Sequence, residues 1–584
     1  MKRIRFNSRT AGQMHTLYVI VICLLVPIPA IGQPLSHAHA FMHADTLRGS
    51  NGPYRAWWDV TQYDVTVRPV FATKSIQGKT TITFIATEPG QRMQIDLQQP
   101  LVVDSVIAEI TKQWDTGGSF GTPHLAFERE GNVVWVELPE PVAKGTRMPM
   151  HIYYHGVPKE ARNPPWDGGW IWKKAPDGTP WMSVACQGLG ASAWYPCKDS
   201  QADEPEAAAL HIIAPDSLVG VGNGRFQGAT PNGDGTKTWN WLVSAPINNY
   251  NLVPSIGPYV LFHEKYAGEN GPLDLDYWVL NTNETKAREH FKQVPSMLKC
   301  FEDWFGPYPF YADGYKLVEA PQLGMEHQSA IAYGNHYLNG YLGSDLSGTG
   351  WGLKWDYVIV HESAHEWFGN SITTADIADM WVHEGFADYA EAIYTQCQFG
   401  DAAGDDYVIG VRKNIANDIP IIGPYGVNQE GSNDMYYKGA NMIHSIRHVM
   451  ANDSLFKAML RGMNLKFRHG IVTSAEVEAF ISSFSGHDFS TVFDQYLRTT
   501  KVPRLEWTVK KDDLFVRWSN CVPGFNMPAM IMVNGEDKMV PITDQWSSPA
   551  HGMNAKTATL QVDRNWYVTV ERVDPNVLKA AKVH

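Results

Sequence analysis

Short segments in which hydrophobic and polar residues alternate fill the chain from about residue 54 to residue 266. They are rich in valine, isoleucine, threonine and aromatic residues, and Gly, Pro and Asn separate them at regular intervals, as around 78–86, 132–138 and 150–154. Alternation with a period of two is typical of strands that bury one face. The pattern predicts antiparallel sheets in an N-terminal β-sandwich-like domain.

Helical spacing replaces this alternation after about residue 273. The first helical stretch is expected at 285–304, because the Gly and Pro residues of 305–310 interrupt it. Several more helices are expected up to about residue 497, and the longest of them cover 353–368, 381–399 and 436–450.

Alternation returns near the end of the sequence, as in 505–509 and 565–571. The order of segments predicts a multidomain α+β protein. Its expected units are an N-terminal β domain at 33–266, a helix-rich domain at 267–502 and a small C-terminal β-sandwich domain at 503–584.

The first 32 residues have the features of a secretory signal peptide. An apolar run at 17–26 is followed by Ala30 and Gly32, the small residues that a cut before Gln33 requires, and four basic residues precede it: Lys2, Arg3, Arg5 and Arg9. A membrane anchor is the alternative, but ten apolar residues are too few to cross a bilayer. We expect an exported protein, periplasmic or extracellular, without a membrane span after cleavage.

The balance of acidic and basic residues limits the classes of molecule that we expect the protein to bind. The chain has 48 basic and 61 acidic residues, a net charge of −13. Removal of the signal peptide would leave 44 basic and 61 acidic residues, a net charge of −17. Nucleic-acid binding normally needs clustered Lys and Arg, so nucleic acid is not an expected partner. The 44% hydrophobic content argues against a largely disordered chain.

Cysteine is sparse. Five of the six cysteines follow the signal segment, which is too few, and an odd number, for a disulfide scaffold. Cys186 and Cys197 are close enough in sequence to pair in an oxidising compartment, and the sequence leaves open whether they do.

The most informative segment is 358–369, which contains His361-Glu362-Ser-Ala-His365 on a predicted helix. Side chains at positions i and i+4 share one helical face, so the two imidazoles can bind one zinc ion. A catalytic zinc needs a third protein ligand, and the candidate is Glu384, nineteen positions later on a second predicted helix. We expect one zinc per chain. Glu362 is then the expected general base, which takes a proton from water and passes it to the leaving amine.

Two neighbours of Glu384 have open roles. His383 is another possible ligand, although its position on the helix makes it point elsewhere and favours a structural role. Asp388 shares a helical face with Glu384 and can accept a hydrogen bond from a ligand histidine, which would orient the ring. The alternative for Asp388 is an acid that faces solvent.

These motifs resemble the gluzincin zinc aminopeptidases, the aminopeptidase N and leukotriene hydrolase family. The likeness covers roughly residues 55–500 in the family's order and implies a thermolysin-like catalytic domain. It rests on the extended zinc helix 361–370, the third-ligand helix 381–387, Leu323-Gly-Met-Glu-His327 where the family has Gly-Ala-Met-Glu-Asn, and Tyr436-Tyr-Lys-Gly439. Gln187 matches a substrate-binding Gln in part of the family, and 248–250 and 305–310 match less specific landmarks.

The resemblance implies a role for each matching residue. His361, His365 and Glu384 hold zinc, Glu362 is the base, and Tyr436 donates its hydroxyl to the oxyanion, with Tyr437 as the alternative. Glu326 pairs with the free α-ammonium of a peptide and restricts cleavage to the first residue, and Gln187 assists it. Gly324 and Met325 lie on a strand that holds the peptide by backbone pairing.

Some features depart from the family pattern. Leu323 and His327 replace a Gly and an Asn beside the pocket for the first residue, so the preferred residue cannot be inherited from relatives. A small C-terminal β domain stands where the family often has a large helical one, so we expect a more open cleft or closure by another subunit. The oligomeric state is left open.

The expected function is that of a secreted zinc aminopeptidase acting on peptides with a free N-terminus. One alternative is a zinc endopeptidase of the same fold. Another is a surface protein that binds glycans without catalysis, using aromatic platforms drawn from Trp57, Trp58, Trp166, Trp170 and Trp172.

Overall fold

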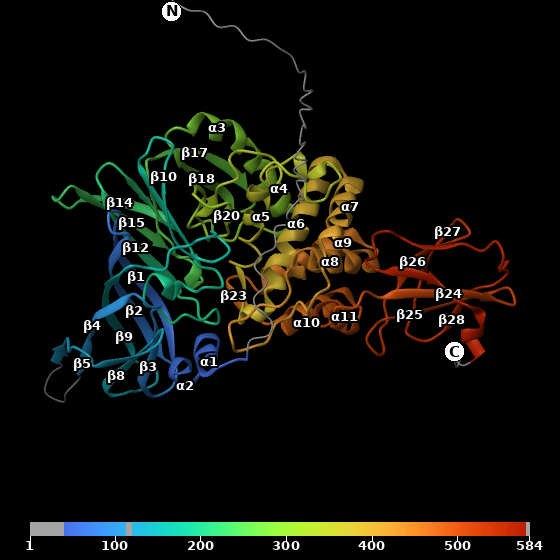
Figure 1. Cartoon of the computed structure of the whole chain (residues 1–584), viewed down its shortest axis with the longest axis horizontal. Coiled ribbons are helices and arrows are strands. Elements are labelled where there is room, and N and C mark those ends of the chain that lie inside the picture. Colours follow the sequence, from blue (N-terminus) through green and yellow to red (C-terminus); the bar gives the residue numbers. More distant parts are fainter. Residues whose placement is uncertain (1–39, 113–118, 580–584) are drawn as a thin grey trace, which may run out of the picture.

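The computed structural model describes residues 40–112 and 119–579. Figure 1 shows an elongated molecule in which the N-terminal β domain, the helices and the C-terminal β domain follow one another along the long axis. The multidomain α+β architecture expected from the sequence is therefore confirmed. The segment interpreted as a signal peptide lies outside the described residues.

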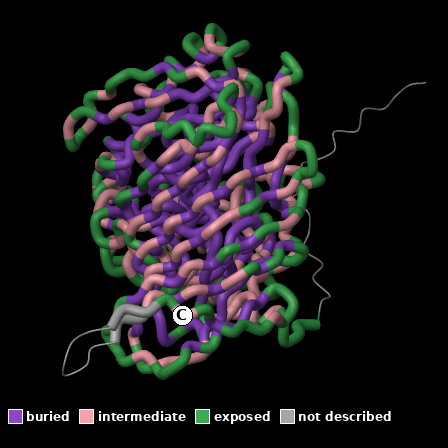
Figure 2. Tube along the Cα trace, turned by 90° about the vertical axis from the view of Figure 1, so that its left-hand side faces the viewer, coloured by how far each residue is buried: buried purple, intermediate pink, exposed green. Residues whose placement is uncertain are grey.

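A seven-stranded sheet is the largest element of the N-terminal domain, in the order β14-β15-β12-β1-β2-β9-β4. From Thr61 to Val70 of β1 every second residue is buried, as the alternating sequence predicts. Figure 2 shows buried residues in the interior and exposed residues at the periphery of the molecule. The sheet is not wholly antiparallel, because β1 and β12 pair in parallel with Val65 opposite Leu210. The strands are β1 Trp58–Val70, β2 Ser75–Ala86, β4 Val102–Ala108, β9 Arg147–Gly156, β12 Ala207–Pro215, β14 Arg225–Pro231 and β15 Thr236–Val243.

Smaller sheets complete this domain. Short helices α1 His43–Gly49 and α2 Pro53–Ala56 precede them. A four-stranded sheet, in the order β10-β11-β16-β13, contains β10 Gly169–Lys174, β11 Pro180–Ala185, β13 Val219–Val221 and β16 Ser255–Gly257. The others contain β3 Gly90–Asp96, β7 Phe127–Glu130 and β8 Val133–Val142, and β5 Ile110–Lys112 with β6 Ser119–Gly121.

The unit for which the sequence predicts catalysis, called the catalytic unit below, begins with a five-stranded sheet in the order β17-β18-β19-β21-β20. Its strands are β17 Tyr259–Gly268, β18 Gly271–Leu280, β19 Tyr315–Glu319, β20 Gly324–Met325 and β21 Ile331–Tyr333. The expected boundary between residues 266 and 267 falls inside β17. Because β17 pairs with β18 along its whole length, this hairpin belongs to the catalytic unit, which starts near Tyr259.

Helices pack against this sheet and make up most of the catalytic unit. The third-ligand segment forms the 19-residue helix α6, with the bounds that the sequence predicts. The zinc-motif helix α5 is shorter than expected and ends at Ala364, where turns lead to Gly369. The helices are α3 Glu284–His290, α4 Val294–Phe305, α5 Tyr357–Ala364, α6 Trp381–Phe399, α7 Asp401–Gly410, α8 Tyr437–Met450, α9 Asp453–Lys466, α10 Ser474–Ser485 and α11 Ser490–Arg498. A two-stranded sheet joins β22 Ile372–Thr374 to β23 Gly470–Val472.

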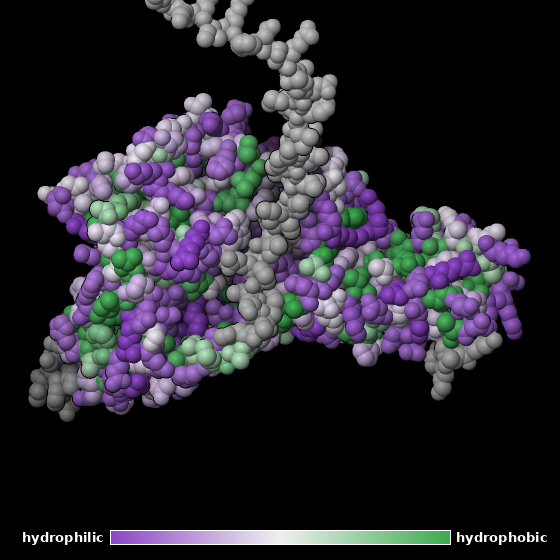
Figure 3. Space-filling view, viewed as in Figure 1, coloured by the Kyte–Doolittle hydropathy of each residue, from purple (hydrophilic) through white to green (hydrophobic). Residues whose placement is uncertain are grey.

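The C-terminal β domain consists of two sheets, in the orders β28-β25-β24-β30 and β27-β26-β29. Its hydrophobic core is continuous with that of the catalytic unit, so the two units support each other. On the face that Figure 3 shows, hydrophilic residues dominate and hydrophobic ones form scattered groups. The strands are β24 Arg504–Lys510, β25 Asp513–Ser519, β26 Ala529–Val533, β27 Glu536–Val540, β28 Ser547–Ala550, β29 Leu560–Val562 and β30 Thr569–Arg572.

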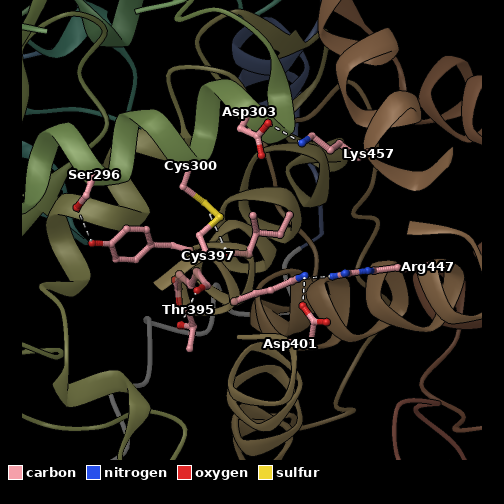
Figure 4. The surroundings of a disulfide bond; sticks show 12 residues. Ser296, Cys300, Asp303, Thr395, Cys397, Asp401, Arg447 and Lys457 are labelled. Carbon is pink, nitrogen blue, oxygen red and sulfur yellow. Dashed lines mark hydrogen bonds and ion pairs between the residues drawn. A yellow bond between two sulfur atoms is a disulfide. The ribbon is translucent and has the colours of Figure 1, made fainter. Parts of the chain in front are cut away.

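A disulfide joins Cys300 of α4 to Cys397 of α6 (Figure 4). The pairing of Cys186 with Cys197 does not occur, and both are buried as free thiols. Within the described ranges, no helix combines the length and the hydrophobicity needed to cross a membrane.

Candidate active site

The two histidines of the zinc motif and Glu384 converge on one point. His361 Nε2 lies 3.3 Å from His365 Nε2 and 3.4 Å from Glu384 Oε2, and His365 Nε2 lies 3.3 Å from the same oxygen. Metal–ligand bonds of about 2.0–2.1 Å in a tetrahedron place neighbouring ligands roughly 3.3–3.4 Å apart. Glu384 Oε2 is buried and accepts no hydrogen bond from the described residues. The donor set and its spacing therefore fit a zinc ion.

Local structure explains how α5 presents the histidines. The Asp356 side chain caps this helix by accepting from the backbone N–H groups of Val358 and Ile359. His361 lies in the last turn, and His365, four residues later, keeps right-handed helical backbone angles although the helix ends. The His365 Nδ1 atom lies 2.9 Å from the carbonyl of Phe368, which fixes the ring and leaves Nε2 free for a metal.

Glu391 holds the other ligand ring. Its Oε1 lies 2.7 Å from His361 Nδ1, and its Oε2 accepts from the Tyr407 hydroxyl. This is the role that the sequence suggested for Asp388. Burial, and then the charge of Glu391, raise the pKa of Asp388 well above its usual range. Glu391 was missed, although its position seven residues after Glu384 places it on the same helical face.

Glu362 lies beside His361, His365 and Glu384, which we call the metal triad, and it faces β20. A Cβ added to Gly324 would lie 2.7 Å from Glu362 Oε1, so this carboxylate lies directly against the strand at Gly324. Burial raises the pKa of Glu362 to about 7, the nearby histidines oppose the shift, and Glu326 and Glu384 add to it. A base with a pKa near neutrality is suited to accept and return a proton.

The two adjacent tyrosines occupy different surroundings. The Tyr436 ring stacks on the ligand His361, with centroids 6.1 Å apart. Burial and the charges of Glu384, Glu430, Glu326 and Glu362 raise the Tyr436 pKa well above its usual value, so its hydroxyl keeps its proton and can donate it.

The charges acting on Tyr437 come from a different set, Asp388, Glu391 and Tyr341. The structure therefore places Tyr436, rather than Tyr437, among the groups around the metal triad.

Glu326 is held in place by residues from the N-terminal domain. Its Oε1 accepts from Gln187 Nε2 at 2.5 Å and from the Tyr250 hydroxyl at 2.9 Å. Its backbone carbonyl accepts from Asn370 Nδ2 at 2.8 Å, and Asn370 in turn accepts from Asn251. Tyr250 lies in a segment that the sequence marked only as a landmark, Asn251 follows it, and Asn370 ends the extended zinc motif; their contacts show that they position Glu326.

The strand that precedes Glu326 has an unpaired edge. β20 pairs with β21 through Gly324 opposite Tyr333 and Met325 opposite Ala332, and it is the outermost strand of its sheet. An edge strand can pair with an extended peptide through its backbone groups. Gly324 and Met325 thus form the edge strand of this sheet.

A further carboxylate near the site was not found in the sequence. Glu430 faces Gly188, since a Cβ there would lie 3.8 Å from Glu430 Oε1, and Gly188 adjoins Gln187. Burial and the charges of Glu384 and Glu326 raise the pKa of Glu430 to about 7. Glu430 lies in a loop without motif spacing, so only the fold reveals its position.

Other candidate residues have structural roles. His383 accepts from the backbone N–H of Thr374 at 3.0 Å and is not part of the metal triad. His327 is buried, which lowers its pKa to about 3. Of the five tryptophans considered for glycan binding, Trp57, Trp58 and Trp170 are buried in the core, and only Trp166 is largely exposed. They do not form a continuous aromatic platform.

Comparisons with known proteins agree with this geometry. Residues 289–496 match the model of the Peptidase family M1 domain. Human aminopeptidase B is 24% identical over 456 residues, which cover 74% of this chain and 63% of that protein. Leucine aminopeptidase 2 of Vanderwaltozyma polyspora is 23% identical over 306 residues, 50% of this chain and 44% of that protein. The chain thus spans less than two thirds of the length of these relatives.

Solved structures show the same fold. An M1 zinc metallopeptidase variant of Deinococcus radiodurans, bound to a Tyr-Ser-Ala substrate, matches with a TM-score of 0.63 and 22% identity. The match covers 78% of this chain and 98% of that chain. The metal triad, Glu362 and Tyr436 all lie inside residues 289–496, the segment that is similar to the Peptidase family M1 domain.

Proposed function

We propose that this protein is a zinc-dependent aminopeptidase that removes the N-terminal residue from peptides. The observation that carries the proposal is the position of Glu326. Its carboxylate follows the edge strand, is held by Gln187 and Tyr250, and is close enough to His365 and Glu384 for their charges to act on its pKa. A carboxylate at the end of a peptide-pairing strand fits a free ammonium group.

The residues then divide the reaction between them. His361, His365 and Glu384 would hold zinc, which when bound polarises the scissile carbonyl and makes water more acidic. Glu362 takes the proton of the attacking water and passes it to the leaving amine. Tyr436 donates its hydroxyl to the oxyanion that develops on the carbonyl. Glu326 binds the ammonium, and the edge of β20 aligns the peptide.

We further propose one catalytic zinc per chain and export through the signal peptide at residues 1–32, to the periplasm or the extracellular space. The Cys300–Cys397 disulfide supports export, because disulfides persist in oxidising compartments.

A substrate panel tests the activity. Purified protein is assayed on aminoacyl chromogenic amides with a broad set of N-terminal residues, each as a free amine and in N-acetylated form. We expect hydrolysis of the free amines only, loss of activity on chelation and recovery with zinc. Equal rates on the acetylated peptides would favour an endopeptidase, and no hydrolysis across the panel by zinc-loaded protein would overturn the proposal.

A further inference from the structure

A second group of metal-ligand side chains lies where α7 and α8 meet the C-terminal β domain. Asp405 of α7 and His444 and His448 of α8 place one ligand atom each within 4.8 Å of the others. Asp405 Oδ1 lies 3.8 Å from His444 Nε2 and 3.9 Å from His448 Nε2. We call these three residues the junction cluster. None of these three residues is part of the metal triad of His361, His365 and Glu384.

Hydrogen bonds do not link Asp405 to the two histidine rings of the junction cluster. Separations of 3.8 and 3.9 Å are too long for hydrogen bonds between nitrogen and oxygen. His448 Nε2 is inaccessible to solvent and has no hydrogen-bond partner among the described residues. The two rings meet edge to face with centroids 4.5 Å apart, as expected of histidines one helical turn apart. A buried imidazole nitrogen that has no hydrogen-bond partner and faces a carboxylate has the surroundings expected of a metal ligand.

A fourth donor comes from the C-terminal domain. Asn565, in the loop between β29 and β30, places its Oδ1 3.0 Å from His444 Nε2. On the other side of the ring, the Tyr389 hydroxyl of α6 lies 3.2 Å from His444 Nδ1. If Nε2 binds a metal, Nδ1 carries the proton and can donate it to the tyrosine oxygen. This is the usual arrangement of a metal-bound histidine.

Acidic side chains partly neutralise the positive charges of the arginines near the junction cluster. Arg447 is paired with Asp453 and Arg564 with Asp406, at 2.7 and 2.6 Å, whereas Arg412 donates to amide and carbonyl oxygens and lies over the Tyr567 ring. Asp563 lies near enough to act on the pKa of His448.

We propose that the junction cluster, with Asn565, is a second metal site that binds a divalent transition ion such as zinc and connects the catalytic unit to the C-terminal domain. Two imidazoles with carboxylate and amide oxygens form a donor set suited to zinc. The present spacings exceed the roughly 3.3–3.4 Å of a closed tetrahedral site. Binding thus needs small side-chain rotations that draw Asp405 towards the rings.

The loop that contains Asn565 is already docked on the helices. Arg412 donates to the carbonyls of Arg564 and Asn565, and the backbone N–H of Tyr567 donates to Ser445 Oγ at 3.0 Å. A metal ion would add a further link between the same two units. The expected role is structural, so the expected readout is metal content and stability.

Metal stoichiometry of the full chain tests the site. Protein stripped with a chelator is equilibrated with excess zinc, freed of unbound metal and analysed for zinc. We expect two zinc ions per chain in the parent and one in either His448→Ala or Asp405→Asn. In a variant without the catalytic ligands, His361→Ala/His365→Ala, one zinc should remain, and adding His448→Ala should remove it.

The controls separate this site from surface binding and from misfolding. His487→Ala, an exposed histidine outside both sites, should retain two zinc ions. Without metal, all variants should match the parent in circular dichroism, and Asp405→Asn preserves the size of the side chain. Zinc should raise the melting temperature of His361→Ala/His365→Ala but not of the triple variant. A parent that holds at most one zinc, or a second zinc that persists in both cluster variants, would overturn the proposal.

Discussion

Glu362 and Tyr436 contribute to the reaction through single functional groups placed beside the metal triad. The Glu362 carboxylate occupies the space that Gly324 leaves open, and the Tyr436 hydroxyl is held among several carboxylates that keep it protonated. Neither group is needed to complete the triad. Their removal should therefore affect turnover far more than metal binding.

Glu362→Gln should retain zinc and lower kcat by roughly 10²–10⁴-fold, because the amide cannot take a proton from water. The measurement is kcat on the best aminoacyl amide together with zinc analysis of the same preparation. Turnover like that of the parent would assign the base to another residue.

Tyr436→Phe should lower kcat by roughly 10²–10³-fold with a smaller effect on KM, because its hydrogen bond strengthens as charge develops on the oxygen. Tyr437→Phe is the matched control, since its hydroxyl lies among Asp388 and Glu391 instead. If Tyr437→Phe showed the larger loss, the assignment would move to that residue.

Close contacts between helices fix the relative positions of Glu384 and Tyr436. α6 carries Glu384, and α8 begins directly after Tyr436. The two helices approach closely at Gly385 and Gly439, where a Cβ on Gly439 would lie 3.2 Å from the Gly385 Cα. The glycine of the Tyr-x-Lys-Gly motif thus allows Tyr436 to lie near the metal triad.

Gly439→Ala should move the start of α8 and lower kcat by about tenfold or more, because small misplacements of catalytic groups are costly. A crystal structure or a pair of kcat and KM values tests this expectation. Gly462→Ala in α9, where a Cβ would meet only the flexible Phe484 and Phe480 side chains, is the control. Unchanged kcat in Gly439→Ala would show that the helix contact adjusts without cost.

The turn after α5 contains a buried carboxyl, Glu366, which accepts from Ser329 N and Tyr308 Oη at 2.8 and 2.9 Å. Burial raises its pKa to about 8. A raised acid pKa stabilises the fold fully below about pH 4.5, and this stabilisation is lost as the pH rises through about 8.

The melting temperature of the parent should fall relative to that of Glu366→Gln between pH 5 and pH 9. The contribution at stake is at most on the order of 4 kcal/mol, since one pKa unit corresponds to about 1.4 kcal/mol. Glu289→Gln, an exposed residue of α3, should show no such trend. Parallel pH curves for parent and Glu366→Gln would contradict a raised pKa.

Long-range links hold the whole molecule together. The N-terminal domain supplies Gln187 and Tyr250 to a site that the helices otherwise build, so neither unit forms the site alone. The Cys300–Cys397 disulfide connects α4 to α6, residues 97 positions apart, and so ties the third-ligand helix to its neighbour (Figure 4).

Cys300→Ser/Cys397→Ser should lower the free energy of unfolding by roughly 2–5 kcal/mol, because the bond restricts a long loop of the unfolded chain. Urea denaturation followed by tryptophan fluorescence measures this change. Cys521→Ser, which removes a free cysteine, is the control. Equal midpoints for parent and double variant would show that the bond contributes nothing under those conditions.

The sequence by itself determined the features that depend on local spacing. Alternation predicted the strands, helical periodicity predicted α6, and a four-residue spacing placed His361 and His365 on one face. The zinc motif and the position of Glu384 on the next predicted helix were enough to indicate the third ligand. Within each helix, the turn imposes the same side-chain geometry wherever it occurs.

Only the tertiary structure decided which distant side chains meet. It selected Glu391 over Asp388, brought Glu430 and Tyr250 towards Glu326, and paired Cys300 with Cys397. It also paired β1 with β12 in parallel and gathered Asp405, His444 and His448 beside Asn565. These contacts depend on how helices and sheets pack, and packing is set by the whole set of buried side chains rather than by the spacing within any one segment.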